Sequence, residues 1–488
     1  MTTLAGRKIA RPGLRAGATR ADVLAHDRPG LVAHSGGTAS DSHRIPRPAS
    51  GVIMSHRVID VIDVVGLGDG GFADLPGSSR RLVLGAQVLI GGQRHLGLVP
   101  TVEGQVRAEW PRPLTSSLSG FLEDHGAAAG GAGEPGKGAV VVLASGDPLC
   151  SGIGTTLIRL LGAHAVRVHP ALSSSTLARA RMGWSAETTT VLTVVGRSLS
   201  PIHAHLDPGE RLVVLCSDGS TPAAVAGLLR DGGCGDSVLT AWWHLGGSAE
   251  GVRTATASRW DPTPTLDLVV LCILVDPAGA LARPALGPAP GRPESAFDHD
   301  GQITKRDLRA SALAHLRPVR GGHLWDLGAG SGAVGIEWTL AAPGARTTAV
   351  ERDPVRASRI RRNAVALGVE PAVQVITAEI SVALARLDPP DAVFLGGGLT
   401  AEVVDLAWEC LTPGGRIVAH AVTLGTEAAV VTACARLGGL LTRMAVEHAR
   451  PLGPHLSWTP SRPVVQWSAT KPLESATRHT DQPPSEHA

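Results

Sequence analysis

Short apolar runs recur along most of the chain, each ending in Gly, Ser or Asp, and stretches with helical periodicity separate them. The runs fall into two regions, 58–276 and 297–470. We predict strands over 61–65, 139–143, 191–195, 212–215 and 266–275 in the first region, and over 323–327, 347–350, 373–376, 392–395 and 416–419 in the second. Strands that alternate with helices are typical of parallel sheets. The pattern therefore predicts two α/β domains, each built on a parallel sheet.

Polar or proline-rich segments flank and separate these regions. Residues 1–57 show no sustained periodicity, so we interpret them as a disordered tail or, because Met54 directly precedes the first strand, as a mis-assigned start. The proline-rich segment 277–296 has the composition of a semi-rigid linker. Residues 471–488 are again polar, and we expect a second disordered tail there.

Composition narrows the class of protein. The 488 residues carry a net charge of +2, whereas a dedicated nucleic-acid binder normally has a basic excess, so we expect no nucleic-acid partner. The longest apolar run, 266–275, is half of the ~18–20 residues that a membrane helix needs. The six cysteines are scattered without zinc spacing, so we expect no metal site. These features, with no secretory signal, predict a cytoplasmic protein.

The most informative motif of the second region joins a predicted strand to a tight glycine turn and a helix. Gly328, Gly330 and Gly332 form the turn, and such glycines allow a backbone to approach a ligand at a helix N-terminus. Glu351 ends the next predicted strand, where a carboxylate can accept hydrogen bonds from both ribose hydroxyls. The segment therefore predicts a nucleotide-like cofactor site.

Two cofactors fit this outline. A dinucleotide fold would accept Ala333 as the last position of G-x-G-x-x-G/A, and an unoccupied glycine turn is a third possibility. Asp326, two residues before the turn, completes the pattern D-x-G-x-G-x-G of S-adenosylmethionine (SAM) methyltransferases, which 410–418 also resembles. We therefore favour SAM.

Further segments make this resemblance specific. The sequences GQITKRDLRA (301–310), LWDLGAGSGAVGIEW (324–338) and AVERDP (349–354), followed by DAVFLGGG, HAVTL and PVVQW, resemble the C-terminal half of the precorrin-6Y C5,15-methyltransferase (decarboxylating) family. The resemblance implies a Rossmann-like class I SAM methyltransferase fold. It implies cofactor contacts at Thr304, Asp326, Gly328, Ala329, Gly330, Ser331, Gly332, Glu351 and Ala378. Thr304 is equally compatible with a simple helix cap, and Gly396, on the substrate side, with a plain turn.

The first region carries three loops at predicted strand ends. Together they predict one cleft, and their small or polar residues are Gly66 and Gly68, Gly146 and Asp147, and Ser173 and Ser174. In this order the loops resemble the tetrapyrrole methylase family, in which SAM lies between two α/β lobes. GGQRHL (91–96), VVGR (194–197) and WWHLGG (242–247) resemble the N-terminal half of the same fused family. Asp147 is also compatible with a helix cap.

The resemblance implies two SAM sites and a corrin precursor as the substrate. The first domain would methylate C5 of precorrin-6B, and the second would methylate C15 and decarboxylate the ring C acetate, giving precorrin-8 in cobalamin biosynthesis. A polycarboxylate substrate favours arginine contacts, and Arg94, Arg179 and Arg309 lie beside the motifs, although surface arginines are commoner. Glu337 is either a proton-handling catalytic group or a plain helix residue.

Other functions stay open at this point. A cobalt-precorrin, an RNA or a protein are alternative substrates for a methyltransferase of this composition. A non-catalytic SAM-binding protein is a further alternative, although both glycine loops are intact. We also expect a homo-oligomer.

Overall fold

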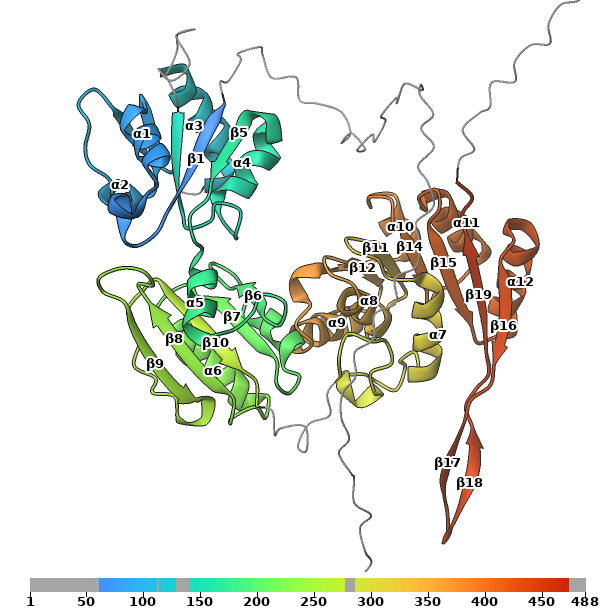
Figure 1. Ribbon diagram of the computed structural model, residues 1–488. Coiled ribbons are helices and arrows are strands. Elements are labelled where there is room, and N and C mark those ends of the chain that lie inside the picture. Colours follow the sequence, from blue (N-terminus) through green and yellow to red (C-terminus); the bar gives the residue numbers. More distant parts are fainter. Residues whose placement is uncertain (1–60, 112–113, 129–139, 277–285, 474–488) are drawn as a thin grey trace, which may run out of the picture. The chain divides into compact units, whose positions relative to one another are not determined.

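The computed structural model describes residues 61–111, 114–128, 140–276 and 286–473 (Figure 1). The predicted tail 1–57, residues 277–285 of the predicted linker and residues 474–488 lie outside the described residues. The described residues form three sheets with helices, together with a two-stranded hairpin. The predicted α/β class is confirmed.

The first sheet is parallel, as predicted, and is buried on both faces. Its strand order is β3-β2-β4-β1-β5, and every residue of β1 is buried. Fully buried strands are nearly continuous apolar runs, because helices cover both faces of a parallel sheet. The elements are β1 (Ile62–Leu67), η1 (Gly71–Asp74), α1 (Gly77–Gly85), β2 (Val88–Gly91), α2 (Gln93–Gly97), β3 (Val106–Glu109), α3 (Leu114–Ala128), β4 (Val140–Ser145), α4 (Ile153–Leu161), η2 (Ala163–Ala165) and β5 (Val166–His169).

The second sheet is mostly antiparallel, so the prediction of a parallel sheet was wrong here. Its order is β6-β7-β10-β8-β9, and only β6 and β7 pair in parallel. For β8 and β9 the reason is the short connection 244–250, because a parallel crossover needs a dozen or more residues. The elements are α5 (Ser174–Met182), β6 (Thr190–Thr193), η3 (Ser200–His205), β7 (Arg211–Leu215), α6 (Thr221–Asp231), β8 (Val238–Trp243), β9 (Gly251–Thr256), η4 (Ala257–Arg259) and β10 (Val269–Leu274).

The third sheet has the order β13-β12-β11-β14-β15-β19-β16, with parallel strands from β13 to β15 and an antiparallel β19. The order reverses between β11 and β14, and ligands of such sheets bind outside the carboxyl ends of the strands at this point. The elements are η6 (Glu294–Ala296), α7 (Arg306–Leu316), β11 (His323–Leu327), α8 (Ala333–Ala341), β12 (Arg346–Glu351), α9 (Pro354–Ala366), η7 (Glu370–Ala372), β13 (Val373–Thr377), α10 (Ile380–Leu384), β14 (Ala392–Leu395), α11 (Ala401–Cys410), β15 (Arg416–Ala421), α12 (Leu424–Leu437), β16 (Leu440–Met444) and β19 (Val464–Thr470).

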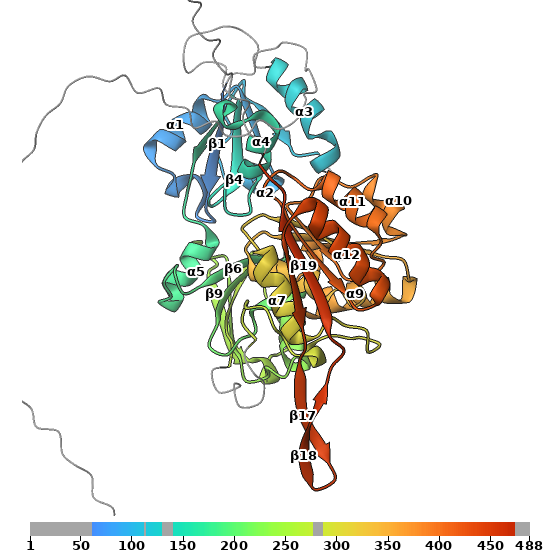
Figure 2. The same cartoon turned by 90° about the vertical axis from the view of Figure 1, so that its right-hand side faces the viewer.

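The core of this domain has two parts, one on each face of the sheet. On one face α10, α11 and α12 pack over residues such as Trp325 and Trp467, and on the other α7 and α8 pack over Leu324 and Phe394. A hairpin of β17 (Glu447–Leu452) and β18 (His455–Pro460) extends from β16 and β19 (Figure 2), and all its strand residues are exposed. The sheet thus leaves the carboxyl ends of β11, β12, β14 and β15 open for a site.

Candidate active sites

The glycine turn after β11 has a backbone that only glycine adopts easily. Gly328, Gly330 and Gly332 have φ of +66°, +60° and +75°. A Cβ on Gly328 would lie 2.3 Å from the carbonyl oxygen of Gly397, and one on Gly332 would lie 2.6 Å from Ile360 Cγ2. The turn is therefore packed closely against its neighbours from behind.

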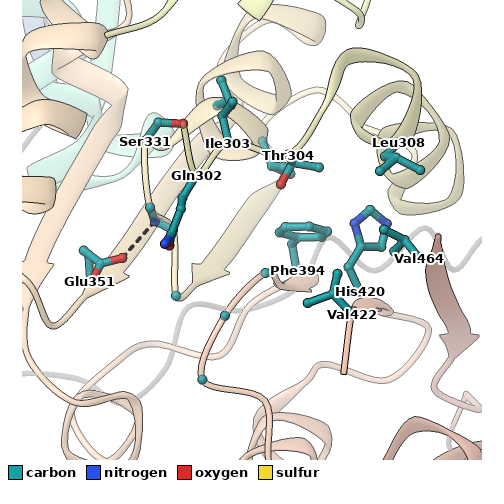
Figure 3. Close-up of a pocket in the computed structure, with 18 of the residues that line it drawn as sticks. Gln302, Ile303, Thr304, Leu308, Ser331, Glu351, Phe394, His420, Val422 and Val464 are labelled. Atoms are coloured by element: carbon teal, nitrogen blue, oxygen red, sulfur yellow. Dashed lines mark hydrogen bonds between the residues drawn. The ribbon is translucent and has the colours of Figure 1, made fainter. Parts of the chain in front are cut away.

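Glu351, the last residue of β12, holds this turn in place. Its carboxylate is 5% exposed and accepts hydrogen bonds from the N–H of Gly330 (2.8 Å; Figure 3) and of Asp353 (3.0 Å). An ionised carboxylate has about four lone-pair positions, so two remain for a ligand's hydroxyl groups. The arrangement suits the ribose of a nucleotide-like cofactor.

Asp326 lies on β11 directly behind the turn and is 1% exposed. One carboxyl oxygen accepts a hydrogen bond from the N–H of Gly335 (2.9 Å), and the other has no partner among the described residues. Burial, with a smaller contribution from the charge of Glu351, raises the pKa of Asp326 to about 7. A buried carboxyl group with one unpaired oxygen lowers the stability of the fold, so a role of Asp326 at the site would explain why it is there.

This raised pKa predicts a pH dependence of stability. Between pH ~4 and ~7 the folded state holds a proton that the unfolded state has lost, so the free energy of unfolding falls as pH rises, by at most about 1.4 kcal/mol per pH unit. In Asp326→Asn this fall is absent. The variant should therefore gain stability relative to the wild type between pH 5 and pH 8 in urea unfolding. An identical difference at both pH values would contradict the prediction.

A cavity of about 900 Å³ opens at the carboxyl ends of β11, β12, β14 and β15, near the upper end of the usual size of ligand pockets. Predicted residues that line it are Thr304, Gly328, Ala329, Gly330, Ser331, Glu351, Ala378 and Gly396. Asp326 and Gly332 lie behind the turn and do not line the cavity. Lys305, not Thr304, is the N-cap residue of α7, and the Thr304 side chain faces the cavity (Figure 3).

Arg309 and Glu337, two further predicted site residues, also lie outside this cavity. Arg309 is fully buried, and its guanidinium donates to the carbonyl oxygens of Thr304 and Arg292 and pairs with Glu337 (2.9 Å). Glu337, 1% exposed, also accepts from the N–H of Gly291 and Arg292 (both 2.8 Å). These bonds leave neither side chain available to a substrate, so both are corrected to structural residues. They fasten residues 291–292, part of the predicted linker, to α8.

The apolar wall of the cavity was not predicted from the sequence. Phe394, His420, Val422 and Val464 line it opposite the glycine turn (Figure 3). His420 follows the predicted strand 416–419, and its position at the carboxyl end of a parallel strand was the signal that could have identified it. Arg462, at the base of the hairpin, also lines the cavity and is exposed.

In the first domain the three predicted loops lie together. The N–H of Gly146 donates to the carbonyl oxygen of Leu67 (2.9 Å), and the N–H of Ala171 donates to that of Gly146 (3.2 Å). A Cβ on Gly66 would lie 2.0 Å from the same Gly146 oxygen, and Gly146 itself has φ of +51°. Gly68, in contrast, has no atom within 4 Å of its Cβ position, so its backbone is open to a ligand.

The polar residues of these loops also hold the loops themselves. Asp147 accepts from the N–H of Leu149 (2.9 Å), and Ser173 is the N-cap of α5, accepting from the N–H of Thr176 (3.1 Å). Ser174 is exposed. The structure thus brings the predicted residues together and gives two of them a local role.

Beside these loops lies a cluster of polar side chains that the sequence did not predict to lie together. Asp69 accepts from Arg94 (3.2 Å) and lies 2.9 Å from His244 Nδ1, while His95 Nε2 lies 2.8 Å from Ser145 Oγ. Burial and the neighbouring Arg94 charge lower the pKa of His95 to about 4, so its ring is neutral at pH 7. Arg94 is therefore bound within the domain rather than a free surface arginine.

Arg179, the remaining predicted substrate contact, lies on α5. It is half-buried, and its guanidinium donates to Thr176 Oγ1 over 3.4 Å.

Across the described ranges, no helix is long and apolar enough to cross a membrane. No group of three or more His, Cys, Asp or Glu side chains within those ranges has the arrangement of a metal site.

Both domains match families of known function. Residues 61–258 match the family described as Tetrapyrrole (Corrin/Porphyrin) Methylases, and residues 295–471 match the Precorrin methyltransferase domain. The chain is therefore a SAM-dependent methyltransferase.

Full-length relatives narrow this class to one family. The chain is 42% identical over 413 residues to the precorrin-6Y C(5,15)-methyltransferase [decarboxylating] of Sinorhizobium sp, covering 84% of this chain and 96% of that protein. It is 40% identical over 418 residues to the enzyme of that name from Mycobacterium tuberculosis (strain ATCC 25618 / H37Rv), covering 84% and 100%. The chain belongs to the precorrin-6Y C5,15-methyltransferase (decarboxylating) family, which confirms the resemblance seen in its motifs.

A solved structure is also similar to part of the chain. The C-terminal domain of precorrin-6Y C5,15-methyltransferase from Rhodobacter capsulatus is 46% identical and covers 38% of this chain and all of that one, with a TM-score of 0.37.

Proposed function

We propose that residues 58–276 methylate C5 of precorrin-6B, and that residues 297–470 methylate C15 and release CO₂ from the ring C acetate, giving precorrin-8. The observation that carries this proposal is the 900 Å³ cavity in which the glycine turn and Glu351 face an apolar wall. One side of it suits a nucleotide-like cofactor, and the other suits a large conjugated ring. The names of the full-length relatives support the two methylations and the decarboxylation, and their division between the two domains is part of the proposal.

The residues of the second domain fit SAM. Gly330 leaves room for a ligand against the backbone, Glu351 offers carboxylate oxygens to a ribose, and the Thr304 and Ser331 side chains line the same cavity. SAM supplies the methyl group when it is bound. The protein's own contribution is to hold donor and acceptor in line, and such positioning lowers a barrier by several kcal/mol without any metal.

We propose a second SAM site in the first domain, at the three loops. The supports are the open backbone at Gly68, the convergence of the loops on Gly146, and the polar cluster around Asp69 directly after Gly68. Neither reaction requires a metal, since the meso carbons of a reduced tetrapyrrole are already nucleophilic. The conjugated ring accepts the electrons left by CO₂.

The carboxylates of the macrocycle need cationic partners. In the second domain Lys305 and Arg462 take the place predicted for Arg309, since both line the cavity and are exposed. Arginine pairs with carboxylates in a bidentate manner. Gly396 lies at the end of β14 in the same cavity, where its backbone is available to the substrate. In the first domain Arg94 and Arg179 stay the candidates.

Mass spectrometry after incubation of the full chain with SAM and precorrin-6B tests this function. We expect a product with two more methyl groups and one CO₂ less, together with two SAM sites per chain in calorimetry. Turnover only of the cobalt-containing analogue would favour a cobalt-precorrin substrate. An unchanged precorrin in both forms would contradict the proposal and favour RNA or protein as the substrate.

A cytoplasmic location without nucleic-acid or membrane partners belongs to the same proposal.

We further expect a homo-oligomer, because the β17–β18 hairpin has no buried face. Leu452, Leu456 and Trp458 are 66%, 72% and 69% exposed, and an isolated two-stranded hairpin is at best marginally stable in water. A second copy of the chain would cover these side chains. Light scattering should give a multiple of 50.1 kDa, and Trp458→Ser should shift the mass towards one chain. A wild-type mass of one chain would contradict this expectation.

A further inference from the structure

His420 lies in the wall of the second domain's cavity, at the carboxyl end of β15. Its side chain is 7% exposed, and its ring packs edge-on against Phe394 with ring centres 5.1 Å apart at 85° (Figure 3). Leu308, Val422 and Val464 line the same part of the cavity. A titratable ring in an apolar wall, next to the space proposed for the macrocycle, is a candidate for a role in the reaction as well as in packing.

The hydrogen bonding of this ring leaves one nitrogen free for a ligand. Nε2 lies 2.9 Å from Oε1 of Gln466, which is 1% exposed on β19. A carbonyl oxygen can only accept, and in the tautomer that donates from Nε2 to this oxygen Nδ1 keeps its lone pair. Nδ1 makes no hydrogen bond to any residue that the structure describes. His420 therefore offers a proton acceptor to the cavity.

The proposed chemistry of this domain needs a group that first accepts a proton and then donates one. Replacing hydrogen by methyl at C15 frees one proton, because the carbon gains a methyl group and must lose its hydrogen to restore conjugation. Loss of CO₂ from the ring C acetate leaves an electron pair on the exocyclic carbon, and that carbon takes up one proton to become a methyl group. The two protons balance.

We propose that His420 Nδ1 takes the proton from C15 and delivers it to the exocyclic carbon of ring C after CO₂ has left. This inference rests on the proposed function of the second domain. It adds the residue that moves the proton and links the two reactions through it.

The surroundings of His420 suit both halves of the relay. Burial lowers the pKa of His420, so the resting ring is neutral and ready to accept. The methylated intermediate is cationic with an acidic C15 hydrogen, so a weak base suffices. A desolvated imidazolium is in turn a strong donor towards carbon, and general acid–base groups of this kind contribute about 10²–10⁴-fold in rate.

The variant His420→Asn tests the relay. We expect C15 methylation and CO₂ release both to fall at least about 100-fold, while C5 methylation and SAM affinity, measured by calorimetry, stay unchanged. The matched control is His323→Asn, a buried histidine of the same sheet that bonds Thr348 and lies outside this cavity. Wild-type rates in His420→Asn, or loss of only one of the two reactions, would overturn the proposal.

A measurement on the wild type decides the question even if His420→Asn does not fold. In D₂O the relay predicts a ring C methyl group without deuterium, because its hydrogen comes from C15 of the substrate. Full incorporation of one deuterium, with none in recovered substrate, would mean protonation by solvent and would overturn the relay. If the wild type neither methylates C15 nor releases CO₂, the proposed function fails instead.

Discussion

We expect Glu351→Gln to bind one SAM per chain instead of two and to yield a product with one new methyl group and all its carboxylates. Both oxygens of Glu351 accept backbone hydrogen bonds, from Gly330 and Asp353, and a glutamine has one acceptor oxygen only. The turn loses a bond, and the ribose loses its charged acceptor. Hydrogen bonds to charged groups contribute about 1.5–3 kcal/mol each, so the affinity of this site should fall about 100-fold or more.

Calorimetry with SAM, followed by mass spectrometry of the product, measures both effects. Glu409→Gln is the matched control, because Glu409 is exposed on α11 and does not line the cavity. It should bind two SAM. Two sites of wild-type affinity in Glu351→Gln would show that SAM does not contact this carboxylate.

The glycine turn and its acid were predictable because they depend on local rules. A positive φ at Gly328 or Gly330 selects glycine wherever it occurs, and a strand that ends in Glu351 places a carboxylate at the sheet edge. Such features can be seen in a few consecutive residues. The cavity itself confirms that eight predicted residues lie together, but their contact with SAM stays a prediction.

Side-chain direction was not predictable in the same way. Arg309 stands near the motif in sequence, but it points into the core of the domain, where Glu337 on another helix completes its pairing. Conversely, His420 on β15 and Arg462, in the connection between β18 and β19, reach the cavity from far along the chain. Only the packing of α7 and β15 against the rest of the domain decides these directions.

Whether strands pair in parallel or antiparallel was equally unpredictable from the sequence. The apolar runs of β8 and β10 resemble those of a parallel sheet, because both are largely buried whichever way they pair. The polar cluster at Asp69 joins residues up to 175 positions apart, as in its contact with His244. No short motif carries that information.

In the first domain we expect Gly66→Ala to abolish C5 methylation and to leave C15 methylation and CO₂ release intact. The added Cβ would lie 2.0 Å from the oxygen of Gly146 and 2.7 Å from the nitrogen of Ala171, so the three loops must separate. The bond from Ala171 to Gly146 would be lost with them. SAM binding to this domain and its thermal stability should both fall, as calorimetry and differential scanning measure.

Two further alanine variants separate packing from cofactor contact. Gly85→Ala and Gly68→Ala each place a Cβ with no atom within 4 Å, so neither should disturb the fold. Gly85 lies on α1 away from the loops, and its variant should keep full SAM affinity. Gly68→Ala should fold normally and still bind SAM more weakly, because its Cβ would occupy space that only the ligand uses. Unchanged SAM affinity in Gly68→Ala would therefore contradict a SAM site at these loops, even if Gly66→Ala were inactive.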